Sequence, residues 1–187
     1  MKIVTHNKNK YLEYKEKFYE YGIKLDWVNI EYMEIQSDDP MKIVYESVEY
    51  VKKIVEEPFF LEDAGLNIKS LNGFPGPYSS YVHNKIKNSG ILKLMQNIED
   101  RSAEFYAIIG YFDGNETHLF KGSVKGKIIE EEKGVNGFGY DPIFKPNNSD
   151  KTFGEMDIKE KNSFSHRSMA FNEFIEYLKK FGEKNKI

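Results

Sequence analysis

The hydrophobic pattern at the start of the chain predicts a strand, a helix and a second strand. Residues 2–5 are typical of a short buried strand. From Lys8 onward, aromatic residues recur at steps of three and four, which is the spacing of one helix face. Gly22 is a natural end for this helix, and an extended segment at residues 25–30 follows. The aromatic face of the helix consists of Tyr11, Tyr14, Phe18 and Tyr21.

A second helix and two further strands are predicted in the next part of the chain. Pro40 opens a helix over residues 41–56, because proline is favoured in the first helical turn. The apolar run Phe59–Leu61 predicts a buried strand, and residues 66–71 alternate apolar and polar side chains as a half-buried strand does. A rigid turn at residues 73–77 precedes more helical pattern. The apolar face of the predicted helix consists of Met41, Val44, Val48, Val51 and Val55.

The second half of the chain predicts a long hairpin, a loop and a final helix. Residues 105–112 and 117–129 have the pattern of antiparallel strands joined across Asp113–Glu116. Residues 134–146 are glycine-rich and predict a loop, and the last helix is expected over residues 168–181. A strand–helix–strand start followed by a long hairpin indicates a mixed α/β fold.

Composition narrows the class of protein. The chain has 187 residues, of which 40% are hydrophobic, so we expect one globular domain over residues 1–187. Lysine and arginine number 27 against 30 acidic residues, and a net charge of −3 argues against a nucleic-acid partner. Cysteine is absent, so any metal ion must be held by oxygen or imidazole ligands.

The sequence also indicates where the protein works. The segment Met1–Thr5 turns polar at once and lacks the apolar core of a signal peptide. No stretch approaches the roughly 20 apolar residues of a spanning helix. We therefore expect a cytoplasmic protein with no membrane partner.

The segment from Thr5 to Lys10 is the first candidate site. It lies between the first predicted strand and the first predicted helix, where free backbone N–H groups and the positive end of the helix dipole favour an anion. Lys10 adds a direct donor for phosphate oxygens. The alternative is structural: Asn7 caps the helix and the lysines are solvated. No glycine-rich phosphate loop is present to decide between them.

The second candidate is Glu62-Asp63, directly after the predicted strand 59–61. Two adjacent carboxylates at the end of a buried strand repel each other unless a cation or a donor lies between them. Mg²⁺ takes oxygen ligands and is usually held by one or two carboxylates plus phosphates. Glu34, at the end of an extended segment, offers another carboxylate. A metal site and an ordinary surface turn both remain open.

Two further segments carry candidate ligands for an aromatic base. In Gly137–Pro142 the glycines allow close backbone approach, and the rings of Phe138 and Tyr140 can stack on a base. A turn anchored in the core is the alternative. Ser165-His166-Arg167 precedes the last helix, where Ser165 can cap the helix and the two basic residues can bind phosphate or a purine carbonyl. His83 has no such neighbours and is interpreted as ordinary.

Together, in this order, these segments resemble those of the inosine triphosphate pyrophosphatase family, which hydrolyses purine nucleoside triphosphates. The resemblance covers essentially the whole chain. It implies an elongated mixed β-sheet flanked by helices in two lobes, with the active site in the cleft between them. The matching segments are Thr5, Asn7 and Lys10; Glu34–Gln36; Glu62–Leu66; Leu71–Tyr78; Gly137–Pro142; Thr152–Met156; Lys161; and Ser165–Arg167.

The resemblance implies a Mg²⁺-dependent enzyme that converts ITP, dITP or XTP to the monophosphate and pyrophosphate. It makes Asp63 and Lys10 the catalytic residues, with Asp63 as the base or orienter for the attacking water. The metal ligands it implies are Glu34, Glu62 and Asp63. The substrate-binding residues it implies are Thr5, Asn7, Lys10, Phe138, Tyr140, Asp141, Lys161, His166 and Arg167. A homodimer is also implied, with the turn at Pro75–Tyr78 as a plausible interface.

Two departures from the family pattern affect the phosphate contacts. His6 stands where a small residue is common. The helix over residues 41–56 carries a phosphate-facing lysine in many members, whereas Glu46 and Glu49 occupy the corresponding stretch here. A nucleotide sensor that turns over slowly is the rival reading, but such a protein would be expected to lose the three carboxylates, and all are present.

Overall fold

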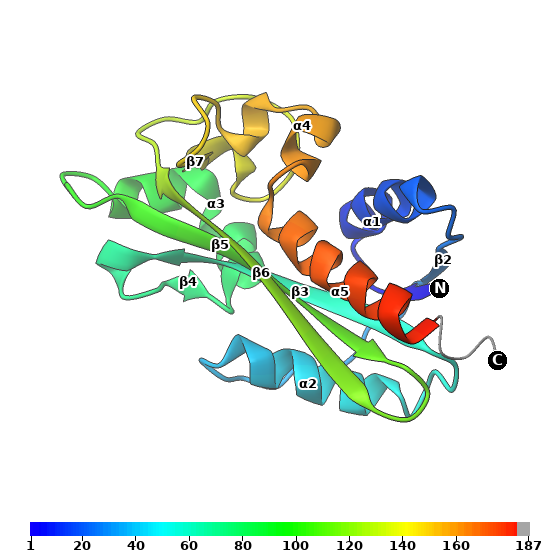
Figure 1. Ribbon diagram of the computed structural model, residues 1–187. Helices are drawn as coiled ribbons and strands as arrows, with labels where there is room; N and C mark the ends of the chain where they lie inside the picture. Colours follow the sequence, from blue (N-terminus) through cyan, green and yellow to red (C-terminus); the bar gives the residue numbers. More distant parts are fainter. Residues whose placement is uncertain (183–187) are drawn as a thin grey trace. The chain divides into compact units, whose positions relative to one another are not determined.

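The computed structural model describes residues 1–182 and contains a mixed α/β fold (Figure 1). Within this part of the chain seven strands form one sheet in the order β2-β1-β3-β5-β6-β7, and β4 pairs with β3. β1 is parallel to β2 and β3, whereas β4 and β7 run antiparallel to β3 and β6. The strands are β1 (Lys2–Val4), β2 (Asp26–Val28), β3 (Phe59–Ile68), β4 (Pro75–Gly76), β5 (Ser102–Phe112), β6 (Thr117–Ile128) and β7 (Phe144–Pro146).

Five α-helices and three short 3₁₀ helices are formed within residues 1–182. No helix in this part of the chain is long and apolar enough to cross a membrane. The α-helices are α1 (Lys8–Glu20), α2 (Pro40–Val51), α3 (Ser79–Leu94), α4 (Ile158–Asn162) and α5 (His166–Gly182). The 3₁₀ helices are η1 (Lys69–Leu71), η2 (Asp141–Ile143) and η3 (Phe153–Glu155).

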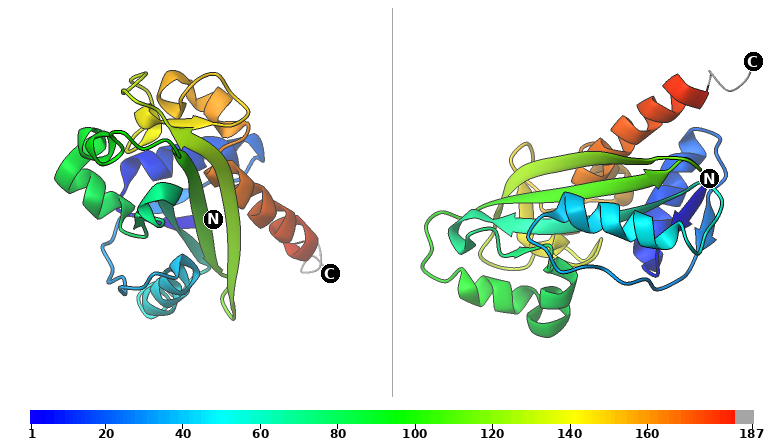
Figure 2. Two further views of the ribbon diagram at one scale, coloured as in Figure 1. Left: turned by 90° about the vertical axis from the view of Figure 1, so that its left-hand side faces the viewer. Right: turned by 90° about the horizontal axis from the view of Figure 1, so that it is seen from below.

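The chain divides into two compact units, and neither is one continuous segment. Unit 1 contains Met1–Asp63 and Ile108–Phe120, and unit 2 contains Ala64–Ala107 and the chain from Lys121 onward. Strands β3, β5 and β6 therefore contribute residues to both units. Figure 2 shows β5 and β6 running side by side as the predicted hairpin. The expectation of one domain over residues 1–187 stays a prediction.

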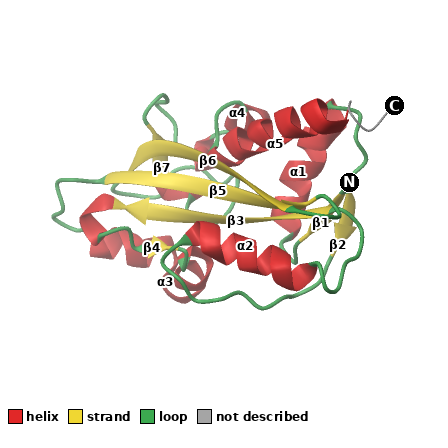
Figure 3. Cartoon of the chain, turned by 60° about the horizontal axis from the view of Figure 1, so that its bottom comes forward, coloured by secondary structure: helices red, strands yellow, loops and turns green. Residues whose placement is uncertain are grey.

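Unit 1 has a core of aromatic and β-branched side chains on its part of the sheet. On α1, Tyr14 and Phe18 are fully buried, and their rings lie 5.2 and 5.5 Å from the ring of Phe60 on β3. Helix α2 lies along the sheet (Figure 3) and packs its valines against Gly110 of β5. The predicted apolar face of α1 is confirmed for Tyr14 and Phe18, which are buried, but not for Tyr21, which is 42% exposed.

Unit 2 has its own hydrophobic core between α3, the sheet and the segment from η2 to η3. The core is dominated by aliphatic and aromatic residues from strands β3, β5 and β7 and from α3. The first turn of α5 is fixed by its cap, because the Ser165 hydroxyl accepts the N–H of Ser168 at 3.2 Å. The helix therefore begins at His166, two residues earlier than predicted. Core members include Leu66, Ile68, Ile91, Met95, Phe105, Phe144 and Phe153.

Two further predicted boundaries were wrong, for different reasons. Strands 59–61 and 66–71 are one ten-residue strand, β3, because its second half pairs with β4, with Leu66 opposite Gly76. Residues 69–71 turn into η1 instead. Helix α2 ends at Val51 and not at Glu56, since the N–H groups of Lys53 and Ile54 bond to carbonyls three residues back and Ile54 is exposed.

We predict that replacing two glycines by alanine destabilises the protein unequally. A Cβ at Gly110 would lie 2.6–2.7 Å from the methyl groups of Val48 and Val44, which can rotate away. A Cβ at Gly122 would collide with the backbone of α5 at His166 and Ala170, and this backbone cannot rotate away. Overpacking costs about 1–3 kcal/mol, so Gly122→Ala should lower the free energy of unfolding toward the top of this range and Gly110→Ala toward the bottom. Urea denaturation measures both, and the reverse order would contradict the packing described here.

Candidate active site

The first loop, residues 5–10, is an ordered turn into the N-terminus of α1. The Asn7 side-chain oxygen accepts the N–H groups of Asn9 and Lys10 at 2.9 and 3.2 Å, so Asn7 is the helix cap. The Asn7 N–H in turn donates to the hydroxyl of the buried Thr5 at 3.1 Å. The structural alternative for Asn7 is therefore correct, and it leaves intact the positive end of the helix dipole that favours an anion.

Lys10 links this loop to the two carboxylates of β3. Its ammonium donates to the backbone carbonyl of Glu62 at 2.8 Å, lies 3.1 Å from the Glu62 carboxylate, and lies 3.9 Å from that of Asp63. The Glu62 side chain is only 1% exposed, while that of Asp63 is 22% exposed. We call Lys10, Glu62 and Asp63 the carboxylate cluster. One cation balances two adjacent acids, one buried and one open to water.

The carboxylates lie inside a strand, which corrects the prediction that they follow one. Glu62 and Asp63 are the fourth and fifth of the ten residues of β3. The Lys10 ammonium reaches both carboxylates, and its closer contact is with Glu62.

Tyr32 shares the surroundings of these acids, and sequence reasoning did not single it out. Burial raises the pKa of the Tyr32 hydroxyl, and the negative charges of Glu34, Asp63 and Glu62 raise this pKa further. The hydroxyl therefore stays protonated at neutral pH and keeps a hydrogen that it can donate to an acceptor. The signal was an aromatic residue between two acids, Glu31 and Glu34, but nothing local showed that Glu62 and Asp63 would lie near it.

The donor set suits a hard cation, although no three-residue cage is formed. Glu62 and Asp63 supply carboxylate oxygens, and the charge of the exposed Glu34 acts on the same tyrosine hydroxyl as theirs. Within residues 1–182, no three histidine or acidic side chains are grouped so as to hold a metal ion. Mg²⁺ commonly uses one or two carboxylates plus phosphate oxygens and waters, so the residues present fit that ion.

In unit 2, residues 137–141 form what we call the aromatic loop. Asp141 closes it: one carboxylate oxygen accepts the N–H of Phe138 at 2.8 Å and the ammonium of Lys161 at 2.7 Å. Asp141 and Lys161 are each 3% exposed. Gly137 has φ +72°, and a Cβ there would collide with the Asp141 carboxylate, so this turn requires glycine.

Phe138 lies close to two cations. The Lys161 ammonium is 5.2 Å from the centroid of its ring, and the Arg167 guanidinium is 5.4 Å away. Both distances fall within the range of cation–π attraction. The Phe138 side chain is half-buried, whereas Arg167 is 2% exposed. Aromatic ring and hydrogen-bond donors are thus brought together as the sequence suggested.

Two further predicted site residues, His166 and Tyr140, are buried in unit 2. His166 stacks on Phe105 with ring centroids 4.7 Å apart and is 3% exposed. Tyr140 donates its hydroxyl to the Ser79 carbonyl at 3.0 Å, and burial raises its pKa. Direct contact of either residue with a base stays a prediction.

His83 is a residue that the sequence interpretation passed over. It meets the Tyr140 ring edge-on at 5.1 Å. Burial lowers the pKa of His83, and the charge of Lys87 lowers this pKa further, although Glu132 and a hydrogen bond to the Gly139 backbone raise it. The histidine that looked ordinary in the sequence is thus part of the support of the aromatic loop.

The predicted site residues gather into two groups, one in each unit. Thr5, Asn7, Lys10, Glu62 and Asp63 lie in unit 1, with Glu34 linked to them through Tyr32. Phe138, Tyr140, Asp141, Lys161, His166 and Arg167 lie in unit 2. The lysine sought on α2 is not supplied by Lys52, which pairs with Glu49 at 2.6 Å.

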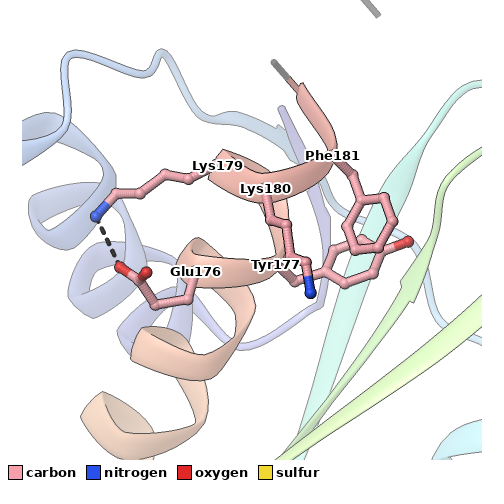
Figure 4. Close-up of a pocket in the computed structure, with 5 residues that line it drawn as sticks. All are labelled: Glu176, Tyr177, Lys179, Lys180 and Phe181. Atoms are coloured by element: carbon pink, nitrogen blue, oxygen red, sulfur yellow. Dashed lines mark hydrogen bonds and ion pairs between the residues drawn. The ribbon is translucent and has the colours of Figure 1, made fainter. Parts of the chain in front are cut away.

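Two pockets elsewhere contain none of these residues. One, of about 730 Å³, follows the outer side of α1 and residues 22–27 of unit 1. The other, of about 540 Å³, lies on the last turns of α5 (Figure 4), where Tyr177 and Phe181 contact each other and Lys179 pairs with Glu176. Neither pocket holds a carboxylate cluster or a clustered set of cations.

Comparison with known proteins identifies the family of this chain. The model of the Ham1 family matches residues 1–177. The chain belongs to the Ham1 family. A relative in Pyrococcus horikoshii named dITP/XTP pyrophosphatase is 46% identical over 176 residues, covering 94% of this chain and 95% of the relative. A protein of the same name in Methanopyrus kandleri is 44% identical and covers 94% of each chain.

Solved structures of Ham1 proteins share the fold. The Ham1 protein of Staphylococcus aureus superposes with a TM-score of 0.80 at 28% identity, over 96% of this chain and 98% of that one. The HAM1 protein of Coxiella burnetii gives a TM-score of 0.82 at 25% identity, over 96% and 99% of the two chains. The expected mixed α/β fold, with a β-sheet flanked by helices, is confirmed.

We predict that the carboxylate cluster depends on its lysine for stability. Lys10→Met removes the ammonium that lies 3.1 Å from the buried Glu62 carboxylate, and breaking a buried pair costs about 3 kcal/mol or more. Adding Glu62→Gln to Lys10→Met should recover most of that loss, because the buried charge is then gone. Unfolding in urea of both single variants and the double variant measures the coupling. Lys8→Met, at an exposed position of the same helix, is the control, and additive effects at positions 10 and 62 would contradict the pairing.

Proposed function

We propose that this chain is a Mg²⁺-dependent pyrophosphatase for deaminated purine nucleoside triphosphates: ITP, dITP and XTP. It would cleave between the α and β phosphates and release the monophosphate and pyrophosphate. The relatives at 43–46% identity over at least 93% of this chain are named dITP/XTP pyrophosphatase, and the chain is a hydrolase of that class. The observation that carries the proposal is the carboxylate cluster, held by Lys10 beside the N-terminus of α1.

We assign the acidic side chains of unit 1 different roles according to their exposure. Glu62, Asp63 and Glu34 would hold the ion, which supplies charge neutralisation on the phosphates and makes a bound water more acidic. Asp63 is more exposed than Glu62 and lies farther from Lys10, so we assign it the acceptance of a proton from the attacking water. Glu62 is buried against Lys10 and is suited to ligation, not to proton transfer.

The Lys10 ammonium can bind either the carboxylates of Glu62 and Asp63 or a triphosphate. Without substrate it neutralises Glu62 and Asp63. A triphosphate placed at the first loop offers several anionic oxygens, and these compete for the same ammonium and for the amide groups at the start of α1. Charge builds up on the leaving pyrophosphate as the bond breaks, so the lysine contributes most at that moment. Thr5 and Asn7 shape the loop that offers these donors.

The side chains of unit 2 match a purine with a carbonyl at position 6. Lys161 and Arg167 are donors, and such donors would face the amino group of adenine, which is itself a donor. A site built to hydrogen-bond one group rejects an analogue that lacks it by large factors. Guanine shares the 6-carbonyl, so its exclusion must come from the added 2-amino group. We propose that Phe138 stacks on the base and that Tyr140, Asp141 and His166 line and support this pocket.

The same chemistry suggests the biological setting. Deaminated purine nucleotides are mutagenic if polymerised, and we propose that the enzyme removes them from the free nucleotide pool of the cytoplasm. We also propose a homodimer. A patch of exposed aromatic side chains from the turn before α3 and from α3 itself supports it, with Phe74 and Tyr78 each 39% exposed and Tyr81 65% exposed.

A substrate panel tests the proposed function. With Mg²⁺, purified protein should convert dITP, ITP and XTP to monophosphate and pyrophosphate, and it should act on ATP and GTP at least about 100-fold more slowly. Products are identified by anion-exchange chromatography with separate assays for pyrophosphate and orthophosphate. Release of single orthophosphate, or equal rates with all purines, would overturn the proposal.

Asp63→Asn tests the assignment of the base. The amide cannot take a proton, so turnover should fall by about 10²–10⁴-fold, while nucleotide affinity measured by calorimetry should change much less. Asp38→Asn, an exposed acid of the same unit, is the control and should keep its activity. A near-normal rate for Asp63→Asn would remove Asp63 from this role.

A further inference from the structure

Trp27 is the chain's single tryptophan, and it contacts the polypeptide on both sides of the first loop. Its indole N–H donates to the backbone carbonyl of Thr5 at 2.7 Å. Its ring stacks on that of Tyr11, with centroids 4.8 Å apart and planes 10° from parallel. Thr5 is the residue before the turn, and Tyr11 is the residue after Lys10. One side chain therefore spans the segment that carries Asn7 and Lys10.

The carbonyl of Thr5 needs this donor because the sheet does not supply one from β3. The pairing of β1 with β3 comprises Lys2 opposite Phe59 and Ile3 opposite Phe60, and it does not reach Thr5. On the β2 side the Thr5 N–H donates to Val28 at 3.2 Å. The indole N–H thus takes the place of a backbone donor at the point where the strand turns into the loop.

We infer that Trp27 is a positioning residue for the triphosphate. By fixing the Thr5 carbonyl and Tyr11, it sets where the Asn7 cap and the Lys10 ammonium lie relative to the carboxylates of β3. The inference rests on the proposed function and adds a residue to it. Placement errors of about an ångström in such groups can cost 10²-fold in rate, so a hydrogen bond away from the reacting atoms can matter for substrate binding.

Trp27→Phe tests the inference, because it keeps an aromatic ring on Tyr11 and removes the donor. A buried acceptor left without its donor should raise the KM for dITP about tenfold. The kcat should fall less, since Asp63 lies on β3 and is not held by the indole. Without substrate, the amides of Asn9 and Lys10, which bond to the Asn7 side chain, should exchange hydrogen about tenfold faster than in the wild type. Tyr19→Phe, on an 82% exposed position of α1, is the matched control.

Residue-specific replacement of tryptophan provides a second form of the test, since only position 27 is changed. A benzothienyl analogue keeps the ring shape but has sulfur in place of N–H, and it should reproduce the higher KM. 5-Fluorotryptophan keeps the N–H and should restore the wild-type KM. These analogues remain informative if Trp27→Phe folds poorly.

The outcomes separate this inference from the proposed function. A wild-type protein that hydrolyses none of the purine triphosphates would overturn both. An active wild type whose KM and amide exchange are unchanged by Trp27→Phe and by the benzothienyl analogue would overturn the inference alone. Equal loss with both analogues would also overturn it, because the N–H would then not be the feature that matters.

Discussion

Two carboxylates next to each other on one strand are costly unless a positive charge is nearby, and Lys10 supplies that charge here. Its ammonium reaches Glu62 and Asp63 from α1, a helix that starts only a few residues after the first strand. The ion pair therefore joins the first loop to the third strand of the chain. Everything proposed for phosphate binding depends on this link, because it places an anion-binding helix N-terminus beside potential metal ligands.

Unit 2 also contains an ion pair, but with a different role. Lys161 and Asp141 form a buried pair at 2.7 Å, and the same carboxylate oxygen also holds the N–H of Phe138. In unit 1 the pair places the carboxylates that we propose as metal ligands beside Lys10. In unit 2 the acid fixes Lys161 and the backbone of Phe138, the groups that we propose bind a base. Buried pairs of this kind add little net stability, which is consistent with a role in placing side chains.

Much of the fold and of the site was predictable from short-range patterns. Helix caps and hairpin spacing identified α1 and the β5–β6 hairpin, and the order of polar segments predicted the candidate site residues. The predictions that were wrong or missing depended on contacts between residues that are distant in sequence. Glu62 reads as the end of a strand until pairing with β4 extends that strand past it. The surroundings of Tyr32 and His83 could not be read locally, since they include Glu62, 30 residues from Tyr32, and Glu132, 49 residues from His83.

The discontinuity of unit 1 has a consequence for synthesis. Its last segment, Ile108–Phe120, follows a 44-residue stretch of unit 2, Ala64–Ala107. When the ribosome has released the first 63 residues, the valines of α2 still lack Gly110, against which they pack. An N-terminal unit usually folds first during synthesis. Unit 1 of this chain cannot fold completely in that order, because part of it is made later. The chain's N-terminal third must wait, with apolar side chains exposed, until the first hairpin strand emerges.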